Sequence, residues 1–417
     1  MEPYDSISAA LVREYPSLLD LYQDLHGHPE LSGQEEWTSE RVGKELEAAG
    51  FATTRGVGGH GVVGVLTRGS GPVVMVRADM DGLPLKEETG LPYTSREKTR
   101  DARGQEVHVM HACGHDLHMA ALIGAARILA SRQDWAGTLV MVGQPSEETV
   151  SGAARMIADG LFSRFPRPDA AIALHVAPEI PAGIIGWREG IISAGGESLD
   201  IVVCGIGGHA AHPERARDPV VLAAQIILAF QTIVSREVPP GELGIITVAS
   251  VHGGSKHNAI PDEVLLQVNI RYFRKEVRDL LLNAIKRVTE GIARSAGITP
   301  PLFPRITLLP QSVPPMTNDP ALTRKVADAF LQCYGADHVL CIDPVTGSED
   351  FGIFGLIEPR IPICYFRIGC GDEKNTCGFL HSNRFSPPPE VIRDAAGALV
   401  IAAEAILDRA PLHPPGR

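Results

Sequence analysis

Three short apolar runs in the first half of the chain constrain its fold more than any other feature. They are PVVMVRADMD (72–81), GTLVMVGQPSEE (137–148) and AAIALHV (170–176). Helical patterns at 7–26, 35–49 and 116–131 lie before and between them. Buried strands that alternate with helices are typical of an α/β fold with a mostly parallel sheet. The sequence therefore predicts a mostly parallel mixed sheet flanked by helices.

Polar side chains follow each of these runs. The first ends in Asp79 and Asp81, the second in Glu147 and Glu148, and the third delivers His175. Ligands of open α/β sheets bind outside the carboxyl ends of the strands. We therefore expect these side chains to gather at one edge of the sheet.

A second cluster lies in the segment HACGHDLHMA (111–120). Within eight residues it contains His111, Cys113, His115, Asp116 and His118. Each of these residues taken alone is more often a core, surface or capping residue than a metal ligand. Together with the paired glutamates, however, a thiolate and an imidazole two residues apart match a transition-metal site. The second glutamate remains available to move protons, so the pattern predicts hydrolysis by metal-activated water.

Composition restricts the setting. The 38 basic and 50 acidic residues give a net charge of −12, which argues against a nucleic-acid partner. The apolar stretch 220–230 is shorter than the ~18 residues of a membrane span, and the N-terminus lacks the pattern of a signal peptide. Seven cysteines without paired spacing fit a reducing compartment, so we expect a cytoplasmic protein with no membrane partner.

The middle of the chain predicts a separate domain. Its pattern is a strand (198–206), a helix (218–236), two strands (245–252 and 264–272), a helix (275–296) and an extended stretch (304–310). This βαββαβ order predicts a ferredoxin-like α+β domain. The α/β pattern resumes with a helix at 319–334, a strand at 361–369 and a helix at 389–408. We therefore expect one domain from 1–193 and 315–417, an inserted domain at 194–314, and a loose tail in the last ten residues.

Nine motifs in order resemble the dinuclear-metal aminoacylase and carboxypeptidase family. Within it they are most similar to the amidohydrolase branch, which includes hippurate hydrolase, N-acetyldiaminopimelate deacetylase and indole-acetyl-amino-acid hydrolases. The motifs are LHGHPELSGQE (25–35), VRADMDGLPLKE (76–87), HACGHDLHMA (111–120), QPSEE (144–148), ALHV (173–176), GGHAAHPERARDPV (207–220), NAIPDE (258–263), GSEDF (347–351) and FLHSNRF (379–385). The resemblance covers nearly the whole chain.

The resemblance implies a catalytic domain with two divalent ions, of Zn, Mn, Co or Ni, and an inserted lid and dimerisation domain. It implies that the metal ligands are Cys113, His115, Glu148, His175 and His381. Glu147 would be the general base, and Cys113 would replace the aspartate that bridges the metals in the wider family. The implied reaction is hydrolysis of N-acyl amino acids, with hippurate-like substrates as the central case, by a homodimer.

Further residues have weaker assignments, and each keeps an ordinary structural alternative. Asp79, Asp81, Asp116 and His118 are expected to support the metal ligands, although the aspartates can instead be caps and Asp116 in particular a helix N-cap. His26 and Glu30 are assigned to structure, and Ser348, Glu349 and Asp350 to scaffolding at the border of the site.

Three residues of the inserted domain match family motifs. His209 would reach the oxyanion or the substrate from the lid, in many relatives from the partner subunit, or would be only a surface histidine. Asn258 and Arg271 would bind polar groups of the substrate, with the Arg271 fork suited to a carboxylate, or would be a turn cap and a solvated arginine.

Two other classes of function are open. Cys113 can be the nucleophile of a thiol amidase with a histidine as its base, although this leaves both glutamates without a role. The chain can also be a non-catalytic binding protein of the same fold, which would not need Glu147.

Overall fold

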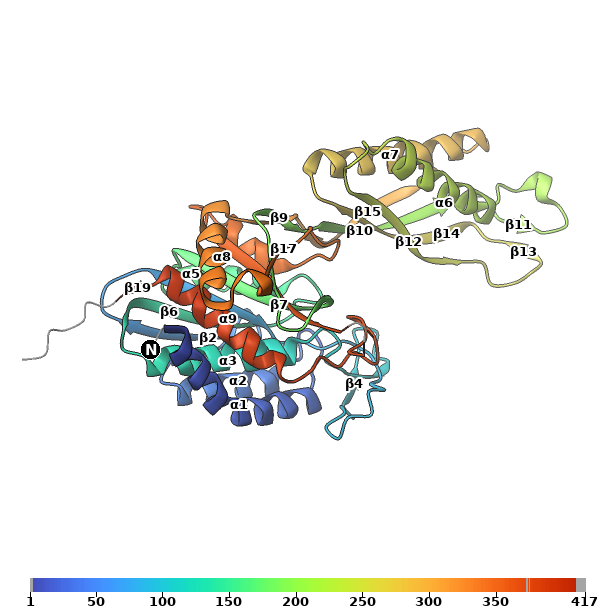
Figure 1. Cartoon of the computed structure of the whole chain (residues 1–417). Coiled ribbons are helices and arrows are strands. Elements are labelled where there is room, and N and C mark those ends of the chain that lie inside the picture. Colours follow the sequence, from blue (N-terminus) through green and yellow to red (C-terminus); the bar gives the residue numbers. More distant parts are fainter. Residues whose placement is uncertain (1–2, 373, 375, 410–417) are drawn as a thin grey trace, which may run out of the picture. The chain divides into compact units, whose positions relative to one another are not determined.

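In the computed structural model, the three apolar runs form neighbouring strands at the centre of one large sheet (Figure 1). The structure describes residues 3–372, 374 and 376–409. In this part of the chain the sheet order is β1 (Ala52–Val57), β2 (Gly61–Arg68), β6 (Trp135–Gln144), β3 (Val73–Asp79), β7 (Ala170–Pro181), β18 (Ile363–Gly371), β8 (Ile185–Trp187) and β17 (Val339–Cys341). Strands β6, β3, β7 and β18 are parallel, whereas β1, β2 and β6 pair antiparallel, as do β8 and β18. The predicted mostly parallel mixed sheet is confirmed.

Helices cover this sheet with apolar faces. They are α1 (Pro3–Gly27), α2 (Glu36–Ala48), α3 (His115–Ser131), α4 (Gly152–Ala158), α5 (Leu161–Arg164), α8 (Pro320–Tyr334) and α9 (Val391–Ile406). Helix α3 is buried along nearly all of its length, and its apolar residues form one core with those of α1, α9 and the strands. The start of α3, which carries His115, is therefore held from several sides.

The chain divides into two compact units. Unit 1 comprises Met1–Ile192, Thr317–Asp343 and Asp350–Arg417, and unit 2 comprises Ser193–Met316 and Pro344–Glu349. The structure thus adds the segment Pro344–Glu349 to the unit that the sequence places at 194–314. The lid and dimerisation role of unit 2 stays a prediction.

Unit 2 has the predicted βαββαβ order. Its antiparallel sheet has the order β12 (Gly244–Gly253), β14 (Glu263–Tyr272), β10 (Gly195–Cys204) and β15 (Arg305–Val313). Alternate residues of the strands, among them Leu199, Ile201 and Val203, form a second core with helices α6 (Pro219–Arg236) and α7 (Lys275–Ser295). The outer strands are thus the second and fourth along the chain, which is the ferredoxin-like arrangement.

Shorter elements complete the described part. They are β4 (Lys98–Arg100), β5 (Glu106–His108), β9 (Gly190–Ser193), β11 (Gly208–His209), β13 (Ala259–Ile260), β16 (Met316–Asn318), β19 (Asp408–Arg409) and the 3₁₀ helices η1 (Pro213–Arg215), η2 (Ala336–His338) and η3 (Asp350–Leu356). The predicted loose tail begins with β19, which pairs with β6, and its last eight residues lie outside the described residues.

Helix α6 is long and apolar enough to cross a bilayer by length and composition, the one such helix in the described part of the chain. Six of its residues, including Leu222, Ile226 and Phe230, are nevertheless buried. This burial within the unit 2 core is typical of a core helix.

Two boundaries differ from the prediction in ways that affect the site. Strand β6 ends at Gln144, so Glu147 and Glu148 lie in a turn after the strand. His175 lies inside β7, which continues to Pro181. It stands just past Ala173, the last residue of β7 that pairs with β3, and therefore still faces the end of that strand.

Candidate metal centre

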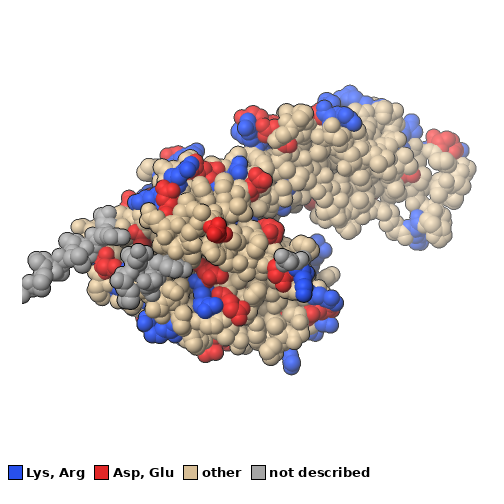
Figure 2. Space-filling model, viewed as in Figure 1, with Lys and Arg blue, Asp and Glu red and all other residues tan. Residues whose placement is uncertain are grey.

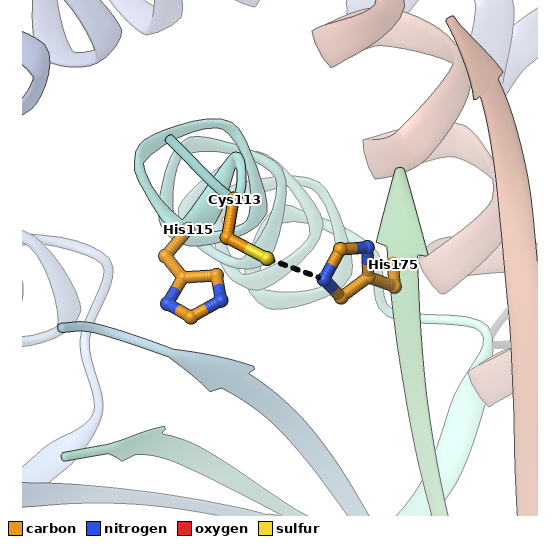
Figure 3. Close-up of side chains that lie close together, drawn as sticks. All are labelled: Cys113, His115 and His175. Carbon is orange, nitrogen blue, oxygen red and sulfur yellow. Dashed lines mark hydrogen bonds between the residues drawn. The ribbon is translucent and has the colours of Figure 1, made fainter. Parts of the chain in front are cut away.

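The five side chains that the sequence assigns to metal binding come together in unit 1. Cys113 precedes α3 and His115 begins it, Glu148 lies in the turn after β6, His175 in β7, and His381 in the loop after β18. The Cys113 Sγ atom is 3.3 Å from His175 Nε2 (Figure 3). It is also 3.3 Å from His381 Nε2. A sixth side chain, that of Glu147, lies beside them, with Oε2 3.9 Å from His115 Nε2.

The donor atoms form two groups that share the thiol. In one, the donors of Cys113, His115 and His175 all lie within 4.8 Å of one another. In the other, the same holds for Cys113, Glu148 and His381. Two groups with a common sulfur fit two divalent cations, which Cys113, His115, Glu148, His175 and His381 would hold. Thiolate, imidazole and carboxylate donors are typical of Zn sites, and they are also compatible with Mn, Co or Ni.

The imidazoles of His115 and His175 are oriented for this role. His115 donates from Nδ1 to the carbonyl oxygen of Asp81 (2.8 Å), and His175 donates from Nδ1 to that of Val176 (2.7 Å). When these rings are neutral, their Nε2 atoms carry lone pairs that point to the cluster. In the described structure His115 Nε2 and Glu148 Oε1 are buried without a hydrogen-bond partner. Because buried polar atoms are rarely left unpaired, these orphans fit a bound cation.

Both ring nitrogens of His118 have hydrogen-bond partners in the structure. It donates from Nδ1 to Asp79 Oδ1 (2.6 Å), and its Nε2 accepts from the backbone nitrogen of Val176 (3.0 Å). Both nitrogens are thus occupied. Burial alone would raise the pKa of Asp79, but His115, Arg77 and His118 outweigh it and hold the pKa well below its usual range. Asp79 is therefore a carboxylate that fixes the adjacent imidazoles.

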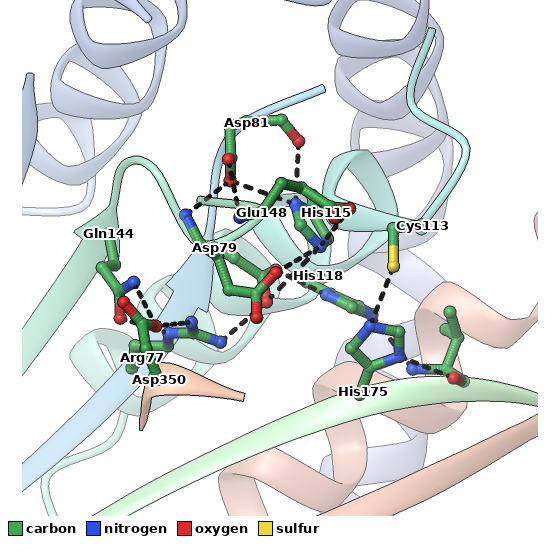
Figure 4. A network of polar contacts seen from close by, with 12 residues as sticks. Arg77, Asp79, Asp81, Cys113, His115, His118, Gln144, Glu148, His175 and Asp350 are labelled. Atoms are coloured by element: carbon green, nitrogen blue, oxygen red, sulfur yellow. Dashed lines mark hydrogen bonds and ion pairs between the residues drawn. The ribbon is translucent and has the colours of Figure 1, made fainter. Parts of the chain in front are cut away.

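Asp81 holds both the histidine and the glutamate turn. Besides its carbonyl contact to His115, its carboxylate accepts from the backbone nitrogens of Glu147 (3.1 Å) and Glu148 (2.9 Å) and from Ser32 Oγ (2.6 Å). Asp81 thus contacts the proposed ligand His115 through its carbonyl oxygen and caps the glutamate turn through its carboxylate (Figure 4).

The N-cap alternative for Asp116 is wrong. Helix α3 begins at His115 after Gly114, and Asp116 Oδ2 accepts from His26 Nδ1 (2.7 Å). His26 also contacts Glu87 Oε1 (3.0 Å). Burial alone would lower the pKa of His26, but hydrogen bonds to Asp116 and Glu87 raise the pKa to about 9. This ion cluster joins α1 to the start of α3. Its position agrees with the structural assignment of His26.

The turn that carries the glutamates is held in an unusual conformation. Ser146 and Val150 have positive φ angles of 57° and 46°. A side chain at Gly152 would meet the carbonyl oxygen of Pro145 at 1.6 Å, so only glycine fits there. Glu35 accepts from the backbone nitrogen of Ser146 (2.7 Å).

Sequence reasoning missed several residues that build the site. Glu35, Arg77 and Gln144 lie within quoted motifs but receive no role. The one available signal was a charged residue, Arg77, in the middle of an apolar run. Glu30 caps α2 through the backbone nitrogens of Trp37 and Thr38, in agreement with its structural assignment.

In the metal-free protein, Cys113 and His115 retain protons at neutral pH, and Glu148 is partly protonated. Burial, together with neighbouring carboxylates, raises the pKa of the Cys113 thiol well above its usual range. Burial lowers the pKa of His115, but nearby aspartates outweigh it and raise the pKa to about 10. Burial raises the pKa of Glu148 to about 7. The pKa values of His175 and His381 are lowered, mainly by burial, so both imidazoles are neutral.

We expect metal binding to release protons and to tighten as the pH rises. At pH 8 a cation displaces about two protons, from Cys113 and His115, because both pKa values lie higher. Below pH 7 Glu148 adds a third. Calorimetric titration of the metal-free protein with Zn²⁺ in buffers of different ionisation enthalpy measures this number. Release of no protons at pH 8 would contradict the assigned ligands.

The other predicted site residues lie in unit 2. His209 is exposed on β11, and its neighbour Ala210 donates from its backbone nitrogen to the carbonyl oxygen of Asn258 (3.2 Å). Arg271 on β14 is partly buried, donates from Nε to Asn269 Oδ1 (2.8 Å) and from Nη1 to Ser348 Oγ. It forms no ion pair with a carboxylate among the described residues, and burial lowers its pKa.

Comparisons with known proteins identify a family and several relatives. The model of peptidase family M20/M25/M40 matches residues 75–405. N-acetyl-L-cysteine deacetylase of Bacillus subtilis is 36% identical over 341 residues, 81% of this chain and 77% of the relative. N-acetyldiaminopimelate deacetylase of Limosilactobacillus fermentum is 34% identical over 393 residues, with 92% and 95% covered. Hippurate hydrolase of Campylobacter jejuni is 35% identical over 350 residues, with 81% and 87% covered.

Solved structures are similar over nearly the whole chain. A putative aminohydrolase of methicillin-resistant Staphylococcus aureus has a TM-score of 0.80 at 28% identity, covering 96% of this chain and 99% of its own. A dinuclear metal-binding peptidase of Bacillus subtilis has a TM-score of 0.76 at 28% identity, with 94% and 98% covered.

Proposed function

The chain belongs to peptidase family M20/M25/M40, and from this membership we propose that it is a metal-dependent amidohydrolase that cleaves N-acyl amino acids. Hippurate-like substrates are the central case. The observation that carries the proposal is the Cys113 thiol shared by two groups of donor atoms, with the carboxylate of Glu147 beside them.

The proposed chemistry assigns a proton-transfer role to Glu147. Two divalent cations, when bound, supply a Lewis acid for the amide carbonyl and lower the pKa of water towards ~7. Glu147 takes a proton from the attacking water and returns it to the departing amine nitrogen. One water is consumed, and the products are a carboxylic acid and an amine. Asp81, which binds the backbone nitrogen of Glu147, keeps this carboxylate in place.

Unit 2 is proposed to bind the substrate as a lid. The Arg271 guanidinium has neutral hydrogen-bond partners and a planar fork, which supports binding of the free carboxylate of an N-acyl amino acid. Asn258 and His209 are proposed to bind the polar amide and the oxyanion. Several relatives named for N-acyl amino acid substrates support this class.

We propose a homodimer that forms through unit 2. Edge strand β12 has no Lys, Arg, Asp or Glu, and its Val251 is 53% exposed. Val221 and Leu228 are exposed on α6. On the face of unit 2 seen in Figure 2, charged side chains gather towards the borders of a broad uncharged area. An unpaired, uncharged edge strand supports pairing with a second copy. The seven cysteines form no disulfide bond in the structure, which supports a cytoplasmic location.

A substrate screen with controlled metal content tests the function. The metal-free protein is supplied with Zn²⁺, Mn²⁺, Co²⁺ or Ni²⁺ and offered N-benzoyl, N-acetyl and indole-acetyl amino acids. We expect release of the free amino acid with at least one metal and none without it. Metal-loaded protein that hydrolyses no member of the series would contradict the proposal.

Replacement of Arg271 by Met is expected to raise KM for hippurate by about 10- to 100-fold. The loss of charge-assisted hydrogen bonds, about 1.5–3 kcal/mol, sets this range. The amide of hippurate, which lacks the carboxylate, should change much less, and initial-rate kinetics with both substrates measure the difference. Arg274→Met is the matched control, because Arg274 is an exposed arginine paired with Glu242. Equal effects on both substrates would exclude carboxylate recognition by Arg271.

A further inference from the structure

Arg77 is a wholly buried arginine to which the proposed chemistry gives no part. It lies in β3, and its side chain has no exposed surface. Its Nε donates to Gln144 Oε1 (2.9 Å), Nη1 to Asp79 Oδ2 (2.7 Å) and Nη2 approaches Asp350 Oδ1 at 3.4 Å (Figure 4). A buried guanidinium is costly unless its partners are well placed. These partners belong to three separate elements, β3, β6 and η3.

The contact to Asp79 leads directly to the imidazoles. Asp79 Oδ1 holds His118, and Asp79 Oδ2 is 3.7 Å from His115 Nε2. Arg77 binds this same Oδ2 atom. The guanidinium therefore holds Oδ2 beside His115 and fixes the carboxylate that orients the His118 ring.

The contacts to Gln144 and Asp350 enclose the glutamate turn. Gln144 is the last residue of β6, immediately before the turn, and donates from Nε2 to Asp350 Oδ1 (2.7 Å). Asp350 Oδ2 accepts from the backbone nitrogen of Ala153 (3.0 Å), which lies in α4 immediately after the turn. Arg77 thus connects both ends of the segment that carries Glu147 and Glu148 to the strand that carries Asp79.

We propose that Arg77 is a positioning residue that sets the distance between the glutamate turn and the His115 imidazole. The inference rests on the proposed function, because it takes His115 and Glu148 as metal ligands and Glu147 as the base. A lysine keeps the charge but has one compact head group and cannot reach three acceptors with fixed geometry. Partners of metal ligands commonly change metal affinity by 10- to 100-fold when they are mutated.

A purely structural role is the competing explanation. In that case Arg77 only neutralises two buried carboxylates, and its replacement lowers the melting temperature without changing the folded site. Two measurements separate the explanations: the affinity for metal, and whether the mutation changes kcat or KM. Neither depends on stability when the protein is fully folded at the assay temperature.

The test compares Arg77→Lys with the wild type by competition for Zn²⁺ against a chelator and by steady-state kinetics. We expect affinity for Zn²⁺ to fall about 10- to 100-fold. At saturating metal we expect kcat to fall about tenfold with KM within about twofold, because Glu147 is displaced and substrate binding is not. Arg278→Lys is the matched control in unit 2, where Arg278 binds the buried carboxylate of Glu197. It should alter the melting temperature alone.

Asp350→Asn is the second variant, which keeps the size of the side chain and removes one charged partner of Arg77. It should weaken Zn²⁺ binding several-fold, and it decides the question if Arg77→Lys does not fold. If the activity of the wild type depends on metal and the folded variants bind Zn²⁺ as tightly as the wild type does, this inference alone is overturned. A wild type that binds no metal would instead overturn the proposed function.

Discussion

Replacement of Glu147 by Gln is expected to reduce kcat by about 10²- to 10⁴-fold and to leave metal binding almost unchanged. Glutamine has the shape of glutamate but cannot take up a proton, so the variant removes general base catalysis, whose contribution is typically of this size. The backbone of the turn should stay in place, because Asp81 binds the nitrogen of residue 147 and not its side chain. Steady-state kinetics on hippurate and metal analysis of the purified protein measure the two quantities.

Glu148→Gln provides the matched control one residue away. Glu148 Oε1 is 3.5 Å from His381 Nε2 and belongs to the second donor group, so this variant should lose metal as well as activity. The different behaviour of two adjacent glutamates is the signature of one base and one ligand. Unchanged turnover in Glu147→Gln would refute the role of Glu147. A wild type that is itself inactive would instead favour a binding protein.

The sequence predicted the fold where local pattern and tertiary packing agree. Helices α6 and α7 and strands β10, β12 and β14 appear within a few residues of their predicted bounds, because their apolar residues have a clear period of 3.6 or 2. The family resemblance is confirmed by the match over residues 75–405.

Strand β7 shows why one boundary escaped prediction. Pro178 and Pro181 normally end a central strand, because proline cannot donate to a ladder. Here pairing with β3 ends at Ala173, while pairing with β18 continues to Pro181. Beyond Ala173 the strand therefore has a free side on which the missing N–H group costs nothing. A single sequence contains no information on where the neighbouring strand ends.

The sequence named the proposed metal donors and four residues expected to support them, but it gave no role to Arg77. Cys113, His115 and Glu148 belong to compact motifs with metal-ligand chemistry, and the structure brings these residues together. Arg77 and Asp350, by contrast, lie 273 residues apart, and only the fold shows that they approach each other. His118 was expected from the sequence to support the metal ligands, and the structure shows partners for both of its ring nitrogens.

Cys113 gives the second large prediction and separates a metal centre from a thiol nucleophile. A catalytic cysteine requires a lowered pKa, whereas burial and the carboxylates of Glu148 and Glu147 raise the pKa of this thiol well above its usual range. With metal present, the proton is displaced and the sulfur serves as a ligand. The position of Cys113 in both donor groups favours this second role.

Cys113→Ala is expected to lose its bound metal, and its activity should fall at least about 10³-fold. The reason is that a cation contributes several kcal/mol to transition-state stabilisation. Cys113→Asp restores two oxygen donors, as in the bridging aspartate of the wider family, and should recover part of both metal content and turnover. A thiol nucleophile predicts a different pattern, in which the activity of the parent is insensitive to chelators and neither variant is active. Activity of Cys113→Asp that is lost with a chelator and regained with Zn²⁺ or Mn²⁺ therefore cannot arise from thiol catalysis.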